Sequence, residues 1–90
     1  FYIQELEQKE AKAREQGGLI QLDADTFMSQ RSLTTAKLAA GGGIEAVKAV
    51  LSGTYRHSYV VVRPPGHHAL ADRPMGFCLF NNVALAARYA

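Results

Sequence analysis

The chain has 90 residues and a mass of 9.8 kDa, which allows one small domain at most and excludes large multidomain machinery. Hydrophobic residues make up 48% and charged residues 20%, a balance that excludes an intrinsically disordered chain. No apolar run reaches the roughly 20 residues of a membrane-spanning helix, so we expect no membrane segment. The sequence begins at Phe1 without a leader pattern and ends at Ala90 inside a helical pattern, and we therefore expect residues 1–90 to be a partial domain, truncated at both ends.

The net charge of +2 is unevenly divided along the chain. Residues 1–16 carry three basic and four acidic side chains, whereas residues 54–90 carry four arginines and one aspartate. These arginines form no basic stripe and do not alternate with aromatic residues, which argues against a nucleic-acid partner. The lone cysteine, Cys78, can form neither an internal disulfide nor a CxxC metal site. It favours a reducing compartment, so we expect a cytoplasmic location, with the nucleus as the alternative for a eukaryotic source.

The first predicted element is an amphipathic helix over residues 3–16. Its apolar residues recur on one stripe, and acidic residues precede basic ones by four positions, which is the favourable order. Gly17 then ends the helix. The short apolar stretch 19–22 predicts a brief extended segment, and the turn-forming residues 23–26 predict a loop after it.

A second helix is predicted to begin between Ser29 and Ser32 and to end near Leu51, before Gly53. Its weak point is the run of three glycines at 41–43, each of which costs about 1 kcal/mol relative to alanine inside a helix. The apolar stripe keeps its phase across this run. We therefore expect one continuous helix with another segment packed close to its backbone.

Residues 58–62 are β-branched or aromatic after the first position and apolar on both faces, a pattern typical of a buried parallel strand. The loop 63–76 would then follow the carboxyl end of that strand, where open α/β sheets build their sites. A last helix is predicted to begin at Asn81 or Asn82, either of which can cap it.

Two adjacent histidines, His67 and His68, follow the stiff sequence Pro64-Pro65-Gly66 in this loop. Because two prolines fix the backbone, the imidazoles are presented rigidly, as catalytic groups must be. Histidine titrates near neutral pH, so one ring could accept a proton while the other holds positive charge. The alternative is a turn whose histidines satisfy local hydrogen bonds. A metal-ligand role is weaker, because adjacent residues in a short loop rarely point both rings at one ion.

The sequence RPPGHHA at residues 63–69, followed by GFCLFNNVA at 76–84, resembles the zinc-dependent histone deacetylase family, and its class II branch in particular. LDADT at residues 22–26 also resembles that branch. The resemblance implies a three-layer α/β fold of the arginase and deacetylase type with a parallel sheet, of which these residues are part. It further implies hydrolysis of the acetyl amide of acetyl-lysine to free amine and acetate.

In the family, the residue matching His68 is the general base and the one matching His67 is its electrostatic or acid partner, both beside a zinc ion. Residues matching Gly76 and Phe77 line the tunnel that holds the acetyl-lysine chain. A rim aspartate binds the substrate backbone, and Asp23 matches it best, with Asp25 as the competing candidate. Cys78 is expected to be buried packing near the site.

The family binds zinc through an Asp-x-His pair and a later aspartate, and residues 1–90 contain no Asp-x-His. We therefore expect no metal ligand in this chain, zinc ligands outside it, and no activity from residues 1–90 alone. Two alternatives remain open at this point. The parent could act on small acetylated polyamines, as related enzymes do, or it could be a metal-free pseudoenzyme or binding module.

Overall fold

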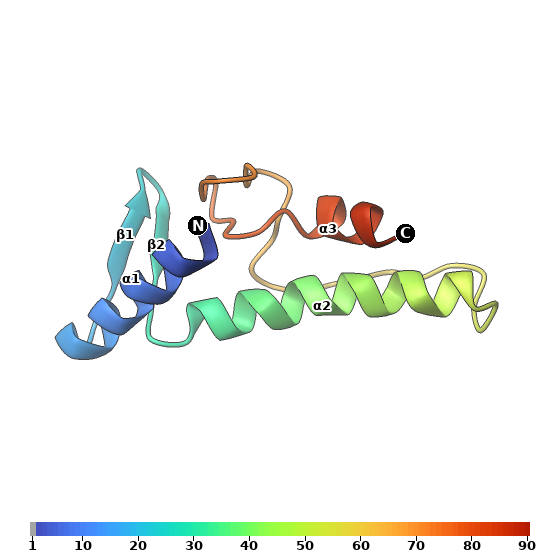
Figure 1. The fold of residues 1–90 in the computed structure, drawn as a ribbon, viewed down its shortest axis with the longest axis horizontal. Coiled ribbons are helices and arrows are strands. Elements are labelled where there is room, and N and C mark those ends of the chain that lie inside the picture. Colours follow the sequence, from blue (N-terminus) through green and yellow to red (C-terminus); the bar gives the residue numbers. More distant parts are fainter. Residues whose placement is uncertain (1) are drawn as a thin grey trace.

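The computed structural model describes residues 2–90 (Figure 1). In chain order, its elements are α1 (Tyr2–Gln16), β1 (Ile20–Asp23), β2 (Thr26–Met28), α2 (Ser32–Leu51) and α3 (Asn82–Tyr89). The long helix α2 runs along the molecule. The helix α1 and the two strands lie at its amino-terminal end, and α3 lies beside its later turns. No helix in the described part of the chain is long and apolar enough to cross a membrane.

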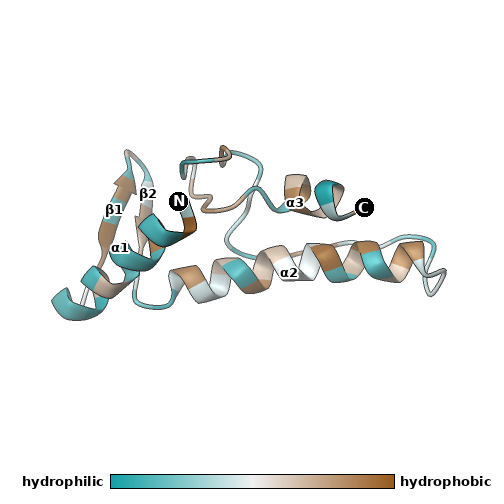
Figure 2. Ribbon diagram, viewed as in Figure 1, coloured by the Kyte–Doolittle hydropathy of each residue, from teal (hydrophilic) through white to brown (hydrophobic). Residues whose placement is uncertain are grey.

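Helix α1 follows the sequence-based prediction within one residue at its start. Leu6 and Ala13 are buried on its inner face. Gly17 has a φ of 66°, a left-handed conformation that glycine adopts without steric cost, and the next amide, Gly18 N–H, donates to the Ala13 carbonyl at 3.1 Å. The helix therefore ends where the sequence indicates. Figure 2 shows that its outer surface is mostly hydrophilic.

Strands β1 and β2 form an antiparallel hairpin in which Ile20 pairs with Met28 and Asp23 with Thr26. The extended segment predicted at residues 19–22 is confirmed by β1. The loop predicted for 23–26 is shorter than expected, because the chain turns back at once and β2 begins at Thr26. The three residues of β2 are too few for an alternation of polar and apolar side chains to identify them as a strand.

Helix α2 is continuous across the three glycines, as predicted. A Cβ built on Gly42 would lie 3.8 Å from Val62 Cγ1, and one built on Gly43 would lie 3.8 Å from Ala86 Cβ, so two other segments do pack along this stretch. Both distances are ordinary van der Waals contacts. The lack of side chains at Gly42 and Gly43 allows this packing, although a methyl group would also fit at either position.

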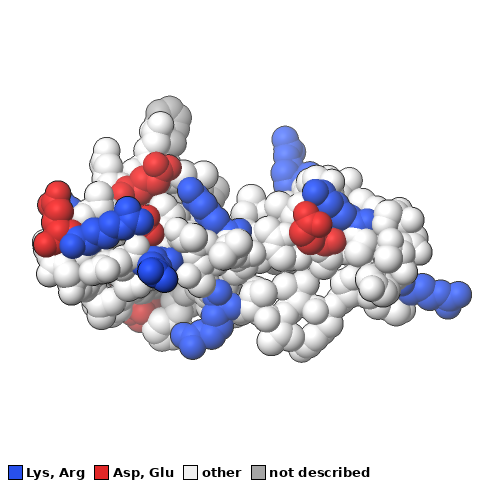
Figure 3. All heavy atoms as spheres, turned by 90° about the horizontal axis from the view of Figure 1, so that it is seen from below, with Lys and Arg blue, Asp and Glu red and all other residues white. Residues whose placement is uncertain are grey.

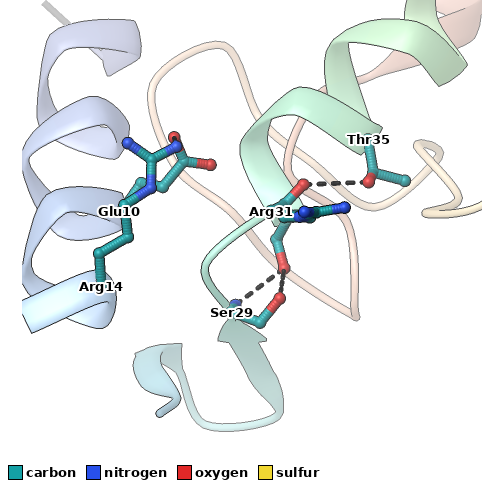
Figure 4. Close-up of polar contacts among 6 residues, drawn as sticks. Glu10, Arg14, Ser29, Arg31 and Thr35 are labelled. Atoms are coloured by element: carbon teal, nitrogen blue, oxygen red, sulfur yellow. Dashed lines mark hydrogen bonds and ion pairs between the residues drawn. The ribbon is translucent and has the colours of Figure 1, made fainter. Parts of the chain in front are cut away.

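The turn before α2 is closed by two serines. The Ser29 backbone N–H donates to Ser32 Oγ at 2.8 Å, while Arg31, in the N-cap position, makes no side-chain capping bond (Figure 4). Figure 4 also shows Glu10 and Arg14 of α1, which form an ion pair at 3.2 Å. The serine pair thus closes the turn from which α2 begins.

The described residues do not show the buried parallel strand predicted at residues 58–62. These residues form no strand, and the sheet found among residues 2–90 is the antiparallel hairpin. Tyr59 is 92% exposed and Val61 79% exposed, whereas Ser58 donates from Oγ to the Ala46 carbonyl of α2 at 3.4 Å. A strand needs a hydrogen-bonded neighbour, and among the described residues the segment 58–62 pairs with none.

Helix α3 begins as predicted, with Asn81 as its cap. The Asn81 side chain accepts a hydrogen bond from the Ala84 N–H at 3.0 Å. The small core lies at the other end of the molecule, where α1, β2, α2 and the segment before α3 meet. Its buried members are Leu6, Met28, Leu33, Ala36 and Leu79.

We predict that Gly41→Ala stabilises the protein by about 0.5–1 kcal/mol, because a helix-interior glycine costs that much relative to alanine and, apart from the adjacent backbone of α2 and the neighbouring residues, no atom lies within 4 Å of the added Cβ. Gly17→Ala is the contrasting variant. It should destabilise the protein, since its φ of 66° is unfavourable for an L side chain. Urea unfolding of both variants provides the measurement, and a destabilised Gly41→Ala protein would contradict a continuous α2.

Candidate active site

The loop between residues 63 and 80 carries both predicted catalytic histidines, and the start of α3 holds it in two places. Asn82 Nδ2 donates to the Pro64 carbonyl at 3.3 Å, and Asn81 Nδ2 donates to the Ala69 carbonyl at 3.2 Å. The two carbonyls lie on either side of the histidines. The loop is therefore held by a hydrogen bond on each side of His67 and His68.

Gly66 allows the loop to approach α3 this closely. A Cβ at this position would lie 2.6 Å from the Phe80 carbonyl oxygen and still closer to the Asn82 backbone nitrogen. Real Cβ atoms do not lie this close to backbone atoms, so a side chain at residue 66 would force the backbone to shift. The φ of Gly66 is not positive, so glycine is required here by the lack of space for a side chain and not by the backbone conformation.

His67 and His68 lie side by side, with ring centroids 4.2 Å apart and an angle of 52° between the ring planes. Both side chains are exposed to solvent. Gly76 packs directly on the second ring, because a Cβ there would lie 2.8 Å from His68 Cβ, Cγ and Cδ2. The structure thus brings together His67, His68 and Gly76.

Gly76 and Phe77 form a tight turn between Met75 and Cys78. The turn is closed by two backbone hydrogen bonds between those flanking residues, at 3.0 and 2.9 Å. Its two central residues have φ values of 54° and 67°, so both are left-handed, as in a type I′ turn. Phe77 is 65% exposed, whereas Cys78 is fully buried, which confirms the expectation that the cysteine packs beneath the site.

The Phe77 backbone N–H donates to Thr26 Oγ1 at 3.0 Å, and Thr26 Oγ1 lies 3.1 Å from Asp25 Oδ1. Thr26 is a residue that sequence reasoning missed. A threonine among turn-forming residues carries no signal of a contact with a loop 51 positions later.

The two candidate rim aspartates have different surroundings. Asp25 is exposed and lines an open groove of about 680 Å³ that is also lined by Phe77, Arg63 and Pro64. Asp23 ends β1, is half-buried and is not among the residues that line this groove. The geometry therefore brings Asp25, rather than Asp23, beside Phe77.

A second open groove, of about 580 Å³, lies between α2, the segment 58–62 and α3, and His67 lies at its edge. Its walls are mostly aliphatic, with Val47, Val60 and Val83 among them. His68 lines neither groove. The histidine pair thus lies at the border of an apolar groove, and the Phe77 turn borders a more polar one.

Tyr2 contacts and holds the segment that follows the Phe77 turn. Its hydroxyl donates to the Leu79 carbonyl at 2.7 Å, and its ring meets Phe80 edge-on at a centroid distance of 6.1 Å. Burial, with the Glu5 carboxylate second, raises the pKa of Tyr2 to about 12. The phenol therefore stays protonated and keeps this hydrogen bond across the neutral range.

In the described part of the chain, no group of three or more His, Cys, Asp or Glu side chains is arranged to hold a metal ion. The residues present do not, by themselves, fit the zinc that the resemblance implies.

Basic side chains are scattered on the face shown in Figure 3 and lie beside acidic ones near α1.

The chain is thus a mixed α/β fragment in which His67 and His68 lie side by side and His68 packs against Gly76 of the Phe77 turn. The profile of the histone deacetylase domain matches residues 1–90, and the chain belongs to that family. It is 49% identical over 77 residues to histone deacetylase HDA1 of Candida albicans, which covers 86% of this chain and 8% of that protein. Over 89 residues it is 48% identical to the uncharacterized protein slr0245 of Synechocystis, covering 99% of this chain and 29% of that one.

The crystal structure of the HDA15 HD domain superposes on 99% of this chain with a TM-score of 0.88 and 31% sequence identity. The match covers 24% of that domain's chain. Histone deacetylase 4 of Caenorhabditis elegans is 46% identical over 72 residues. The relatives include HDA1 proteins and histone deacetylase 4, so the class II resemblance is confirmed, and this chain spans less than a third of each of these proteins.

We predict that Gly66→Ala lowers the free energy of unfolding by about 1–3 kcal/mol, the usual cost of forcing extra atoms into a packed site. The Phe80 carbonyl and the Asn82 nitrogen are backbone atoms that cannot turn aside. Gly18→Ala is the matched control, because nothing lies within 4 Å of a Cβ there and its φ is not positive. Equal unfolding curves for the two variants would contradict the close approach described here.

Proposed function

We propose that these residues are part of the active site of a deacetylase that hydrolyses the acetyl amide of acetyl-lysine to free amine and acetate. One observation carries the proposal: the adjacent rings of His67 and His68, with His68 packed against Gly76 of the Phe77 turn. This arrangement sets a pair of titratable groups beside an exposed aromatic wall.

His68 is the proposed general base. An amide is a poor electrophile, so the attacking water must lose its proton as the bond forms, and a neutral imidazole can accept that proton near pH 7. The same ring then returns the proton to the departing amine. His67, 4.2 Å away, is the proposed electrostatic or acid partner.

Gly76 and Phe77 are the proposed substrate-lining residues. The exposed Phe77 ring offers an apolar surface to the methylene groups of a lysine side chain, and the missing Cβ at Gly76 leaves room beside His68. A lysine stem held along this turn would bring its acetyl group towards the histidine pair.

Two aspartates, Asp23 and Asp25, are candidates for the rim residue. Family likeness favours Asp23, whereas the groove shared with Phe77 supports Asp25. An exposed carboxylate at a groove mouth can accept hydrogen bonds from the backbone amides of a bound peptide. We propose Asp25 for this role because a lysine chain lying on Phe77 would leave its backbone near that groove.

We further propose that the zinc ligands belong to residues outside 1–90, and that the 90-residue chain alone has no turnover. In a chain that carries the whole domain, residues 58–62 would join a parallel sheet. Their side chains already alternate, with Val60 and Val62 turned to the groove along α2 and Tyr59 and Val61 turned to solvent. That alternation and the TM-score of 0.88 support this part of the proposal.

In the full-length protein, His68→Ala should reduce kcat/KM for an acetyl-lysine peptide by about 10²–10⁴, the usual contribution of general base catalysis. Folding and zinc content should be unchanged, because Pro64, Pro65 and Gly66 shape the loop. His57→Ala, in the exposed turn after α2, is the control and should retain activity. Near-normal activity in His68→Ala would show that another group is the base, and loss of zinc would make His68 a ligand.

Asp25→Asn should raise KM for an acetyl-lysine peptide about tenfold or more, because a hydrogen bond to a charged group contributes about 1.5–3 kcal/mol. Asp23→Asn should raise it by less than threefold. Steady-state kinetics with both variants distinguishes the two candidates. A larger effect from Asp23→Asn would return the rim role to Asp23.

A further inference from the structure

Thr26 is a buried polar residue that the proposed chemistry does not use. Its side chain is 1% exposed, and its hydroxyl contacts two groups on the rim of the groove. One is the backbone N–H of Phe77, at 3.0 Å, and the other is the carboxylate of Asp25, at 3.1 Å. One hydroxyl therefore connects the hairpin to the turn that carries the aromatic wall.

We propose that Thr26 is a positioning residue, which holds Phe77 in its left-handed conformation and so sets the surface against which the acetyl-lysine chain binds. The inference rests on the deacetylase function proposed above for the catalytic part only. Its structural part concerns contacts within residues 25–77 and does not depend on any enzymatic activity.

The conformation of Phe77 needs an external support. Its φ of 67° is unfavourable for a bulky L residue, and strained residues of this kind persist only where their surroundings hold them. The two hydrogen bonds that close the turn join Met75 and Cys78 and do not involve the Phe77 amide. That amide is directed at Thr26 instead.

The hydroxyl is oriented as well as placed. A hydroxyl has one proton, and since the Phe77 N–H is a donor, Thr26 Oγ1 must accept there. Its own proton is then free to be donated to Asp25 Oδ1. The charged acceptor fixes the rotation of the hydroxyl and leaves a lone pair facing Phe77.

The acceptor is also rigid. Thr26 begins β2 and pairs with Asp23 in the hairpin, so its backbone is held by the strand ladder. Thr26 is 1% exposed, so its hydroxyl is shielded from bulk water. Removing the oxygen therefore leaves the Phe77 N–H without its protein partner.

The structural test is amide hydrogen exchange at Phe77, measured by NMR on the full-length protein. Thr26→Val keeps the shape of the side chain and removes the hydroxyl, and it should speed exchange at this amide about tenfold, as expected for a hydrogen bond left unmade. Thr26→Ser keeps the hydroxyl and should stay within about twofold of the parent protein. Thr26→Ala is the second variant without a hydroxyl and replaces Thr26→Val if that protein does not fold.

The kinetic test separates positioning from general stability. Thr26→Val should raise KM for an acetyl-lysine peptide about fivefold or more while kcat changes less than twofold, because Phe77 contacts the lysine chain and not the reacting amide. Thr26→Ser should restore KM. Thr54→Val removes an exposed hydroxyl that contacts Ser52 Oγ at 3.0 Å, and as the control it should change neither parameter.

Unchanged exchange at Phe77 in Thr26→Val, failure of Thr26→Ser to restore protection, or a loss confined to kcat would each overturn the inference. Faster exchange together with an inactive parent enzyme would support the structural part and overturn the proposed function instead. The two failures are thus distinguishable.

Discussion

The attachment of the histidine loop to the first turn of α3 is the constraint on which the site depends. Asn81 and Asn82 each donate a side-chain hydrogen bond to a carbonyl in that loop, and Asn81 also caps the helix. A single pair of residues therefore determines where the helix begins and where the histidines lie. The fit is possible because Gly66 has no side chain to separate the loop from the helix.

The other end of the loop is held by a second set of contacts, which it makes with the amino-terminal part of the chain. Leu79 is buried in the core with Leu6 and Met28, and its carbonyl accepts the hydrogen bond of Tyr2. The Phe77 turn is thus held between a cap on its carboxyl side and a small core built by α1 and the hairpin. Although α1 lies far from the histidines in sequence, it contributes to the placement of the turn.

Much of this arrangement could be predicted from the sequence, and the exceptions have physical causes. Helices α1, α2 and α3 were predicted because caps, stop signals and apolar stripes are local features. The strand predicted at residues 58–62 is not seen, because the apolar pattern indicates only a preference for burial, whereas a strand also needs a hydrogen-bonded partner. Thr26 was missed because its role arises from a contact between distant segments, which no local pattern encodes. The roles of His67 and His68 came from family likeness, and the structure adds their proximity.

The unpaired segment at residues 58–62 has a consequence for how the 90-residue chain behaves in solution. It is a short, uncharged stretch rich in β-branched residues that pairs with no strand among the described residues, and its outward side chains, Tyr59 and Val61, are 92% and 79% exposed. Such edges are templates for intermolecular strand pairing. Copies of this chain would therefore associate through this segment as concentration rises, and solubility, more than folding of the helices, would limit work with it in isolation.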